Sequence, residues 1–263
     1  MSEIYPSLLY LWDKRTLYIG PLFEPLNLSQ GAATLVLALD KPISFIVESQ
    51  SEPVECRSLL IPAGLSITID TQDAVVANCN LDALGADFAS LFGRMQCKQG
   101  KVAYQMSCEY DFIARFWGMY ACQMDSFAAY GLLDQMLLAE SGSEYNVDQR
   151  VVDVIDMIKK TIDDNLSVED LADVVNLSVP RLVQLFKQQT GVPIRRYRLW
   201  HRLYVTSVKM GQGYSLTDAA IAAGFTDSSH CSHTFRSMLG MKPSLILSQP
   251  NKIRIITPTS SIS

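Results

Sequence analysis

Polar and basic side chains recur at helical spacing in two stretches of the second half of the chain. Residues 179–190 predict a helix whose outer face carries Arg181, Gln184 and Lys187, opposite an apolar face. Residues 228–239 predict a second helix, whose outer face carries a different polar set: Ser228, Ser229, Ser232 and His233. Side chains of these types form hydrogen bonds with the base edges and phosphates of duplex DNA. The spacing therefore indicates two surfaces suited to nucleic acid.

Each of these helices ends one copy of a repeated pattern. The copies are SVEDLADVVNLSVPRLVQLFKQQTG, residues 167–191, and SLTDAAIAAGFTDSSHCSHTFRSMLG, residues 215–240. Both begin with Ser-x-x-Asp, which caps a short first helix, and both end with a glycine that suits a left-handed helix terminus. A tight turn, with Ser178 or Asp227 as the next N-cap, precedes each second helix. This is the helix-turn-helix plan, and the duplication favours it over a plain helical bundle.

Charge is distributed unevenly along the chain. The net charge of −5 combines ten more acidic than basic side chains in residues 1–149 with five more basic than acidic ones in residues 150–263. Between Val174 and Thr217 there are seven basic residues and no acidic one. A phosphate-binding surface concentrates positive charge in this way, although solvated basic faces are also common. Phosphate contacts are expected from three neighbouring arginines: Arg195, Arg196 and Arg198.

Residues 166–244 resemble the DNA-binding region of AraC/XylS transcriptional regulators. The pieces LFKQQTG, GFTDSSHCSHTFR and GMKPS carry the resemblance. The resemblance implies a two-lobed domain of seven helices, which places two of them in successive major-groove segments of one DNA site. We therefore expect the following residues to contact DNA: Ser178, Pro180, Arg181, Val183, Gln184, Lys187, Arg195, Arg196, Arg198, Ser228, Ser229, Ser232, His233 and Arg236.

A few positions depart from the pattern of this family. Pro180 and Val183 have no side-chain donor, so the first reading helix relies on methyl contacts and on its remaining polar side chains. Ala219 stands where the family usually has a larger aliphatic residue, and Leu245-Ile246-Leu247 replaces the Tyr-Arg that closes its pattern. These departures concern the second lobe more than the first.

The first half of the chain predicts strands. Five segments rich in Val, Ile, Leu and Thr are separated by turn-forming residues: 34–40, 43–49, 54–62, 65–72 and 74–82. Strands at this spacing are typical of a small antiparallel barrel or sandwich. The stretches LVLALDKPISF and LLIPAG resemble the cupin-like sensory domain of one branch of the AraC/XylS family. No histidine precedes His201, so we expect no metal site in this domain.

Helical spacing follows in residues 84–95 and 109–140. In the longer segment, an apolar stripe of Leu133, Leu137 and Leu138 lies on the same predicted face as Phe127 and Tyr130. Such a stripe either packs on the chain's own barrel or forms a dimer interface, and the sequence favours neither. If it is an interface, the dimerising residues are Leu133, Leu137 and Leu138.

Other function classes lack the residues they need. The sequence contains no GxSxG, GxxxxGK[ST], HExxH or paired-glycine fingerprint, so we expect no enzyme activity. The six cysteines form no CxxC pair, so we expect reduced thiols and no metal or cofactor. No apolar run reaches the ~18 residues of a membrane span, and the start lacks a signal pattern. We therefore expect a cytoplasmic protein that does not bind membranes.

The chain is expected to be an α+β protein with two domains. Residues 1–145 are expected to form a cupin-like sensory and dimerisation domain, an antiparallel β-barrel or sandwich with flanking helices. Residues 146–250 are expected to form an all-α DNA-binding domain with two helix-turn-helix units, followed by a tail, residues 251–263. The expected function is sequence-specific regulation of transcription by a homodimer that binds double-stranded DNA, under control of a small-molecule effector or a partner. The alternative is control by protein–protein interaction alone.

Overall fold

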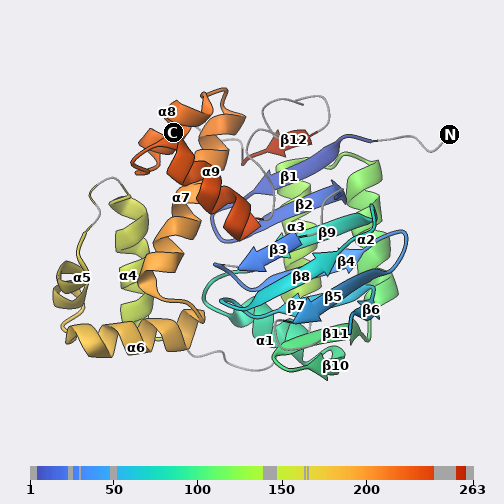
Figure 1. The fold of residues 1–263 in the computed structure, drawn as a ribbon, viewed down its shortest axis with the longest axis horizontal. Coiled ribbons are helices and arrows are strands. Elements are labelled where there is room, and N and C mark those ends of the chain that lie inside the picture. The colour runs from blue at the N-terminus through green and yellow to red at the C-terminus, as the bar shows by residue number, and fades with distance from the viewer. Residues whose placement is uncertain are drawn as a thin grey trace.

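The computed structural model describes residues 5–22, 26–29, 31–47, 52–138, 147–162, 164, 166–239 and 253–258; for residues 26–29, 138 and 239 only the backbone is described. Figure 1 shows two regions side by side. The sheet region comprises the described residues of 5–138, and the helical region comprises those of 147–239. The expected boundary between residues 145 and 146 falls outside the described residues.

The sheet region is built from two sheets. In chain order the strands are β1 (Ser7–Leu11), β2 (Thr16–Pro21), β3 (Leu26–Ser29), β4 (Thr34–Ala38), β5 (Ile43–Val47), β6 (Val54–Cys56), β7 (Ser58–Ile61), β8 (Ser66–Asp70), β9 (Val75–Asn80), β10 (Met95–Gln99), β11 (Val102–Met106) and β12 (Ile253–Ile256). The larger sheet has the order β10-β11-β7-β4-β9-β2-β1-β12, and the smaller has β3-β8-β5-β6. Neighbouring strands are antiparallel, except that β12 runs parallel to β1. Both orders are linear among the described residues, so the expected barrel or sandwich is an open sandwich.

The predicted strand segments of residues 34–82 all contain strands, with one difference. Residues 54–62 were expected to form one strand, but the chain bends at Arg57, so that β6 joins the smaller sheet and β7 the larger. The Arg57 carbonyl accepts a hydrogen bond from Ala38 N at 2.7 Å, and its guanidinium donates to Leu39 O at 3.1 Å. These two bonds to the end of β4 hold Arg57 in place where the chain passes from the smaller sheet to the larger one. The strands outside residues 34–82 were not predicted.

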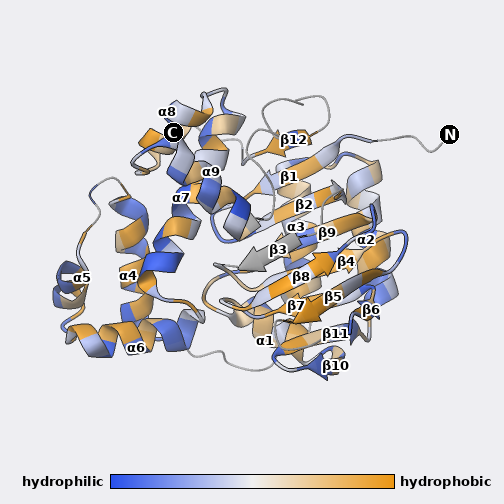
Figure 2. Ribbon diagram, viewed as in Figure 1, coloured by the Kyte–Doolittle hydropathy of each residue, from blue (hydrophilic) through white to orange (hydrophobic). Residues whose placement is uncertain are grey.

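Alternate side chains of the larger sheet enter two different cores. Leu8 and Tyr10 pack against the helices behind this sheet, whereas Leu9 and Leu11 face a core that continues into the helical region. The helices behind the sheet are α1 (Ala86–Phe92), α2 (Glu109–Ala121) and α3 (Ser126–Leu138) (Figure 1). Figure 2 shows the result as hydrophobic colouring along most strands. Burial on both faces explains why β1 and β4 lack the alternation of an amphipathic strand.

The apolar stripe of α3 packs inside the sheet region. Leu133 and Leu137 are fully buried in the core between the larger sheet and its helices, whereas Phe127 is 91% exposed. The prediction that Leu133 and Leu137 form a dimer interface is therefore wrong, because neither side chain is accessible to a second chain. The side chain of Leu138 lies outside the described residues.

A buried ion pair holds the turn between β1 and β2. Arg15 is 6% exposed and donates two hydrogen bonds to Asp87, each at 2.7 Å, and one to Asp134 at 2.8 Å. Asp87 belongs to α1 and Asp134 to α3, so one guanidinium fixes both helices to the turn. Because burial removes water from Arg15 and Asp87, loss of one of these two charges would destabilise the fold by leaving the other without its buried partner.

The helical region follows the sequence closely. Its helices are α4 (Gln149–Lys160), α5 (Val168–Val174), α6 (Val179–Thr190), α7 (Ile194–Gly211), α8 (Leu216–Ala222) and α9 (Ser228–Leu239). The helices predicted over residues 179–190 and 228–239 are present as α6 and α9. Residues 240–252, where a seventh helix would lie, are outside the described residues. Among the described residues, no helix combines the length and apolarity that crossing a membrane requires, and no three potential metal ligands cluster.

Candidate nucleic-acid interface

The first helix-turn-helix unit is formed by α5 and α6. Ser167 and Asp170 form the predicted capping box, in which Ser167 Oγ accepts from Asp170 N at 3.0 Å and Asp170 Oδ2 accepts from Ser167 N at 2.9 Å. The turn passes through Asn176, whose φ of 52° is left-handed. Helix α6 then ends at Gly191 with φ 78°, where a residue without Cβ fits best. The predicted capping box and the predicted glycine at the end of the second helix are confirmed for this unit.

Helix α6 separates an apolar face from a polar one. Leu182, Leu185 and Phe186 are buried in the core of the first unit. On the opposite face Arg181 and Gln184 are exposed, and Arg181 Nη1 donates to Gln184 Oε1 at 3.2 Å. This contact holds two side chains with donor and acceptor groups next to each other on an open surface, which suits bidentate contacts to base edges.

The second unit is formed by α8 and α9 and repeats this arrangement. Ser215 Oγ accepts from Asp218 N at 3.1 Å at the start of α8. Asp227 caps α9, because its Oδ1 accepts from His230 N at 2.7 Å, and this bond lowers the pKa of Asp227. The turn between the helices contains Gly224 with φ 82°. Ser215 and Asp227 thus cap the two helices of the second unit, as the sequence predicted.

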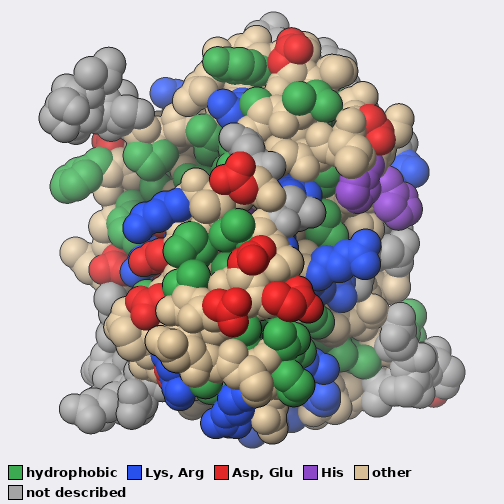
Figure 3. Space-filling model, turned by 90° about the vertical axis from the view of Figure 1, so that its left-hand side faces the viewer, with side chains coloured by type: hydrophobic (Ala, Val, Ile, Leu, Met, Phe, Trp, Pro, Cys, Tyr) green, Lys and Arg blue, Asp and Glu red, His purple; other side chains and the backbone are tan. Residues whose placement is uncertain are grey.

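Helix α7 joins the two units and carries the three arginines expected at phosphates. Arg195 is exposed, whereas Arg196 and Arg198 are half-buried, and burial lowers the pKa of both. In Figure 3, Lys and Arg side chains gather at one edge of this face of the molecule and beside the exposed histidines. Arg195 is therefore the arginine of α7 best placed to reach a phosphate.

The structure brings most of the expected DNA-contacting residues to the surface of the helical region. Exposed members of the set are Ser178, Pro180, Arg181, Val183, Gln184, Lys187, Arg195, Ser229, His233 and Arg236. Half-buried members are Arg196, Arg198, Ser228 and Ser232. Ser178 occupies the N-cap of α6 without a side-chain cap bond. His230 is also exposed on α9, with its ring edge-on to Phe225 and the two centroids 5.4 Å apart.

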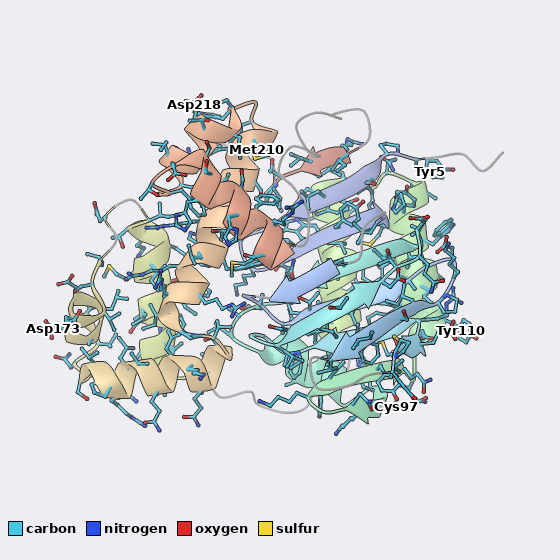
Figure 4. All side chains as sticks on the ribbon, viewed as in Figure 1. Tyr5, Cys97, Tyr110, Asp173, Met210 and Asp218 are labelled. Carbon is cyan, nitrogen blue, oxygen red and sulfur yellow. The ribbon has the colours of Figure 1, made fainter. Side chains whose placement is uncertain are left out.

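The acidic side chains of the first helices lie away from the sheet region. Asp173 of α5 and Asp218 of α8, labelled in Figure 4, sit at the outer margin of the two units. Asp218 also receives a hydrogen bond from Ser215 Oγ at 2.6 Å, so its charge serves the cap. The polar faces of α6 and α9 are thus distinct from the acidic ends of α5 and α8.

A cavity of about 280 Å³ lies between the two regions. The turn between β1 and β2 lines it with Trp12 and Lys14, and the helical region lines it with Lys159, His201, Trp200 and Tyr204. Lys159 Nζ lies 2.7 Å from Asp13 Oδ2, an ion pair that spans the two regions. The sequence did not predict this cavity, because its walls come from segments far apart in the chain.

His201 is a buried titratable group that lines this cavity. Its ring stacks on Tyr204 with centroids 5.8 Å apart. Burial lowers its pKa, the Lys159 cation adds to the shift and Asp13 opposes it, and together these leave the pKa at about 4. The imidazole is consequently neutral at physiological pH.

Comparison with known proteins agrees with this geometry. The family model "Helix-turn-helix domain" matches residues 171–249. The transcriptional activator RhrA of Rhizobium meliloti is 33% identical over 95 residues, which span 33% of this chain and 30% of RhrA. Residues 171–249 are therefore a helix-turn-helix domain. The chain matches less than a third of the length of RhrA, and the match lies in one part of each protein.

Similarity to solved structures extends over both regions. An apo form of ToxT from Vibrio cholerae superimposes with a TM-score of 0.63 at 12% identity, covering 91% of this chain and 98% of that one. ToxT with a bound unsaturated fatty acid superimposes with a TM-score of 0.56 at 12% identity, covering 90% of this chain and 96% of that one. At this identity the similarity shows a shared fold. It places the open sandwich and the helical region together in one known architecture.

Proposed function

We propose that this chain is a sequence-specific DNA-binding regulator of transcription that reads bases with α6 and α9. The observation that carries the proposal is the pair of exposed polar faces on the second helices of two repeated units. Arg181 and Gln184 present a donor and an acceptor side by side on α6. His233 and Arg236 are exposed one helical turn apart on α9. Two short reading helices on one chain address a site longer than either helix reads alone.

Base contacts and phosphate contacts divide between different residues. Arg181 and Gln184 have the fork and amide geometry that pairs with purine edges, whereas exposed Val183 offers methyl contacts. Lys187 and Arg195 are exposed cations that suit phosphates. Loss of a base-reading group lowers affinity only for the preferred site, and loss of a phosphate contact lowers affinity for all sequences.

The test begins with selection of a preferred duplex by the full-length chain from a random pool. Gln184→Ala should then weaken binding to that duplex by about 1–3 kcal/mol and leave binding to random duplex unchanged. Gln149→Ala is the matched control, because Gln149 is an exposed glutamine on α4 bonded to Asp153. Binding that ignores salt, or equal losses on both duplexes for Gln184→Ala, would overturn the proposal.

We further propose that the cavity between the regions binds a small amphipathic effector. Its volume of about 280 Å³ is near the lower end of the roughly 300–1,000 Å³ usual for ligand pockets. Trp12, Trp200 and Tyr204 supply apolar surface, and Lys159 supplies a cation. A carboxylate ligand would compete with Asp13 for Lys159. The unsaturated fatty acid bound by the fold relative ToxT is a ligand of this chemical class.

Thermal-shift titration with a cis-unsaturated fatty acid tests the effector proposal. Lys159→Met should abolish the shift, whereas Lys160→Met, a change at the exposed neighbouring lysine, should preserve it. No shift for the wild-type chain with fatty acids or aromatic acids would favour control by protein–protein interaction alone.

We also propose that the chain forms a homodimer, through a surface other than the one that contains the buried Leu133 and Leu137. Helix α2 exposes Tyr110 and Trp117, and α3 exposes Phe127. A second copy on this surface would raise avidity for DNA by ~10²–10⁴. Sedimentation of the wild-type chain and of the Tyr110→Ser, Trp117→Ser variant tests it, and a wild-type monomer at micromolar concentration would contradict it.

A further inference from the structure

The chain returns to the sheet region after its last described helix. Strand β12, residues 253–256, pairs in parallel with β1 at the edge of the larger sheet, in the register Ser7 to Ile253 and Tyr10 to Ile256. Figure 1 shows this strand beyond the end of α7, at the margin of the sheet. A segment that follows the second helix-turn-helix unit therefore completes a sheet that begins at the start of the chain.

Side chains of β12 contact both regions. Ile256 is 8% exposed and belongs to the core between the larger sheet and its helices. Ile255 lies against Gly211, the last residue of α7, so closely that a Cβ on Gly211 would be 2.8 Å from Ile255 Cγ2. Figure 4 labels the neighbouring Met210 at this end of α7. Arg254, which precedes Ile255 on the same strand, is exposed.

The second helix-turn-helix unit is joined to the sheet region in another way as well. Phe235 and Met238 of α9 are buried in the same core as Leu9 and Leu11 of β1. The first unit has a core of its own, centred on Leu182 and Phe186, and Ala63, Ala83 and Leu84 of the sheet region pack at its margin. The second unit therefore shares a core with the sheet region, whereas the first unit only touches that region.

We propose that β12 is a strap that clamps the second helix-turn-helix unit to the sheet region, and that the clamp lowers the affinity of the full chain for DNA. The inference rests on the proposed DNA-binding function. The clamp holds α9 against the sheet region, the part of the chain in which acidic side chains outnumber basic ones. Release of β12 frees the second unit to adjust and moves the acidic region away. If only a fraction of the molecules has β12 released and can bind DNA, the apparent affinity for DNA is lower than the intrinsic affinity by that fraction.

Variants of the strap in the full chain test this. Ile256→Ser removes a buried side chain, and Arg254→Ser makes the matched change at an exposed position of the same strand. A chain ending at residue 252 removes the strap entirely. Amide exchange in Leu8–Leu11 and small-angle scattering report the strap itself. Anisotropy of a labelled random-sequence duplex reports DNA affinity.

A second set of variants tests the contact between the strap and Gly211 of α7. Gly211→Ala drives a methyl group against Ile255, whereas in Gly211→Ala, Ile255→Ala the nearest remaining side-chain atom is Cβ, at 3.5 Å. The double variant should therefore be no looser than Ile255→Ala alone. This set keeps the proposal testable if Ile256→Ser fails to fold.

Strap loss should speed exchange in β1, enlarge the scattering radius and tighten DNA binding at least about threefold, with Arg254→Ser unchanged. Unchanged exchange in the truncated chain would overturn the strap. Faster exchange with unchanged or weaker DNA binding would overturn the clamp, and loss of a dimer on truncation would show that β12 pairs between copies instead. If wild-type and variants all fail to bind DNA, the proposed function fails, while exchange and scattering still decide the strap.

Discussion

The neutral, buried His201 makes a quantitative prediction about acid stability. Its folded pKa of about 4 lies below its ordinary value of 6.5, because burial disfavours the imidazolium. The unfolded chain therefore takes up a proton as pH falls below 6.5, before the folded chain does. Stability is thus present above pH 6.5 and is lost as pH falls from 6.5 towards 4. Proton linkage places the loss from this one group at about 2 kcal/mol between pH 8 and pH 5.

The perturbation that isolates this effect is His201→Phe. Phenylalanine keeps a ring to stack on Tyr204 but cannot titrate, so every other acid-dependent group contributes equally to both proteins. The difference in melting temperature between wild type and variant should change by roughly 4–8 °C between pH 8 and pH 5, since about 1 kcal/mol shifts a chain of this size by about 2–4 °C. Circular dichroism at matched ionic strength measures it.

Parallel pH profiles would refute the reasoning. If wild-type and His201→Phe melting temperatures fall together from pH 8 to pH 5, then His201 titrates near its ordinary pKa in the folded chain. The imidazole would then be hydrated, and the cavity between the regions would be more open than the packing of Tyr204 and Lys159 implies.

Three further predictions concern other parts of the chain. Arg195→Ala should weaken binding to preferred and random duplexes alike and reduce the salt slope by about 0.9, whereas Arg115→Ala on α2 should change neither; a sequence-dependent loss would contradict a phosphate role. In urea unfolding, Leu137→Ala should cost about 2–5 kcal/mol, and Phe127→Ala less than about 0.5; equal costs would contradict internal packing of α3. Asp87→Ala should cost about 3–5 kcal/mol by the same assay, since a buried guanidinium loses two hydrogen bonds, and a near-neutral effect would show that water reaches that charge.

The helical region could be predicted from the sequence because its signals are local. Ser167 with Asp170, Asp227 and Gly191 each act within a few residues of their own position, through caps whose geometry the structure reproduces. Apolar spacing then assigned the inner face of α6 correctly. The candidate base-reading residues follow from the same spacing, since a face opposite a buried one is exposed.

The rest of the fold depends on contacts between distant segments. Strand β1 is apolar at every position, so it shows no alternation, and β12 is four residues whose partner lies at the other end of the chain. The stripe of α3 predicted an apolar face correctly but could not say what covers it, and Leu133 faces the chain's own sheet. The cavity could not be predicted for the same reason: Lys14 and His201 line it together only once both regions have folded.

The turns of the two units have a consequence for how freely each can vary. In the second turn, a Cβ on Gly224 would lie 2.6 Å from the carbonyl oxygen of Ile162, and its φ of 82° already disfavours other residues. In the first turn the left-handed position is held by Asn176, which tolerates that conformation. A duplicated unit is often assumed to give interchangeable copies. Here a chimera that places glycine at Asn176 should fold, whereas one that places asparagine at Gly224 should not, so the two copies have diverged into one permissive and one constrained turn.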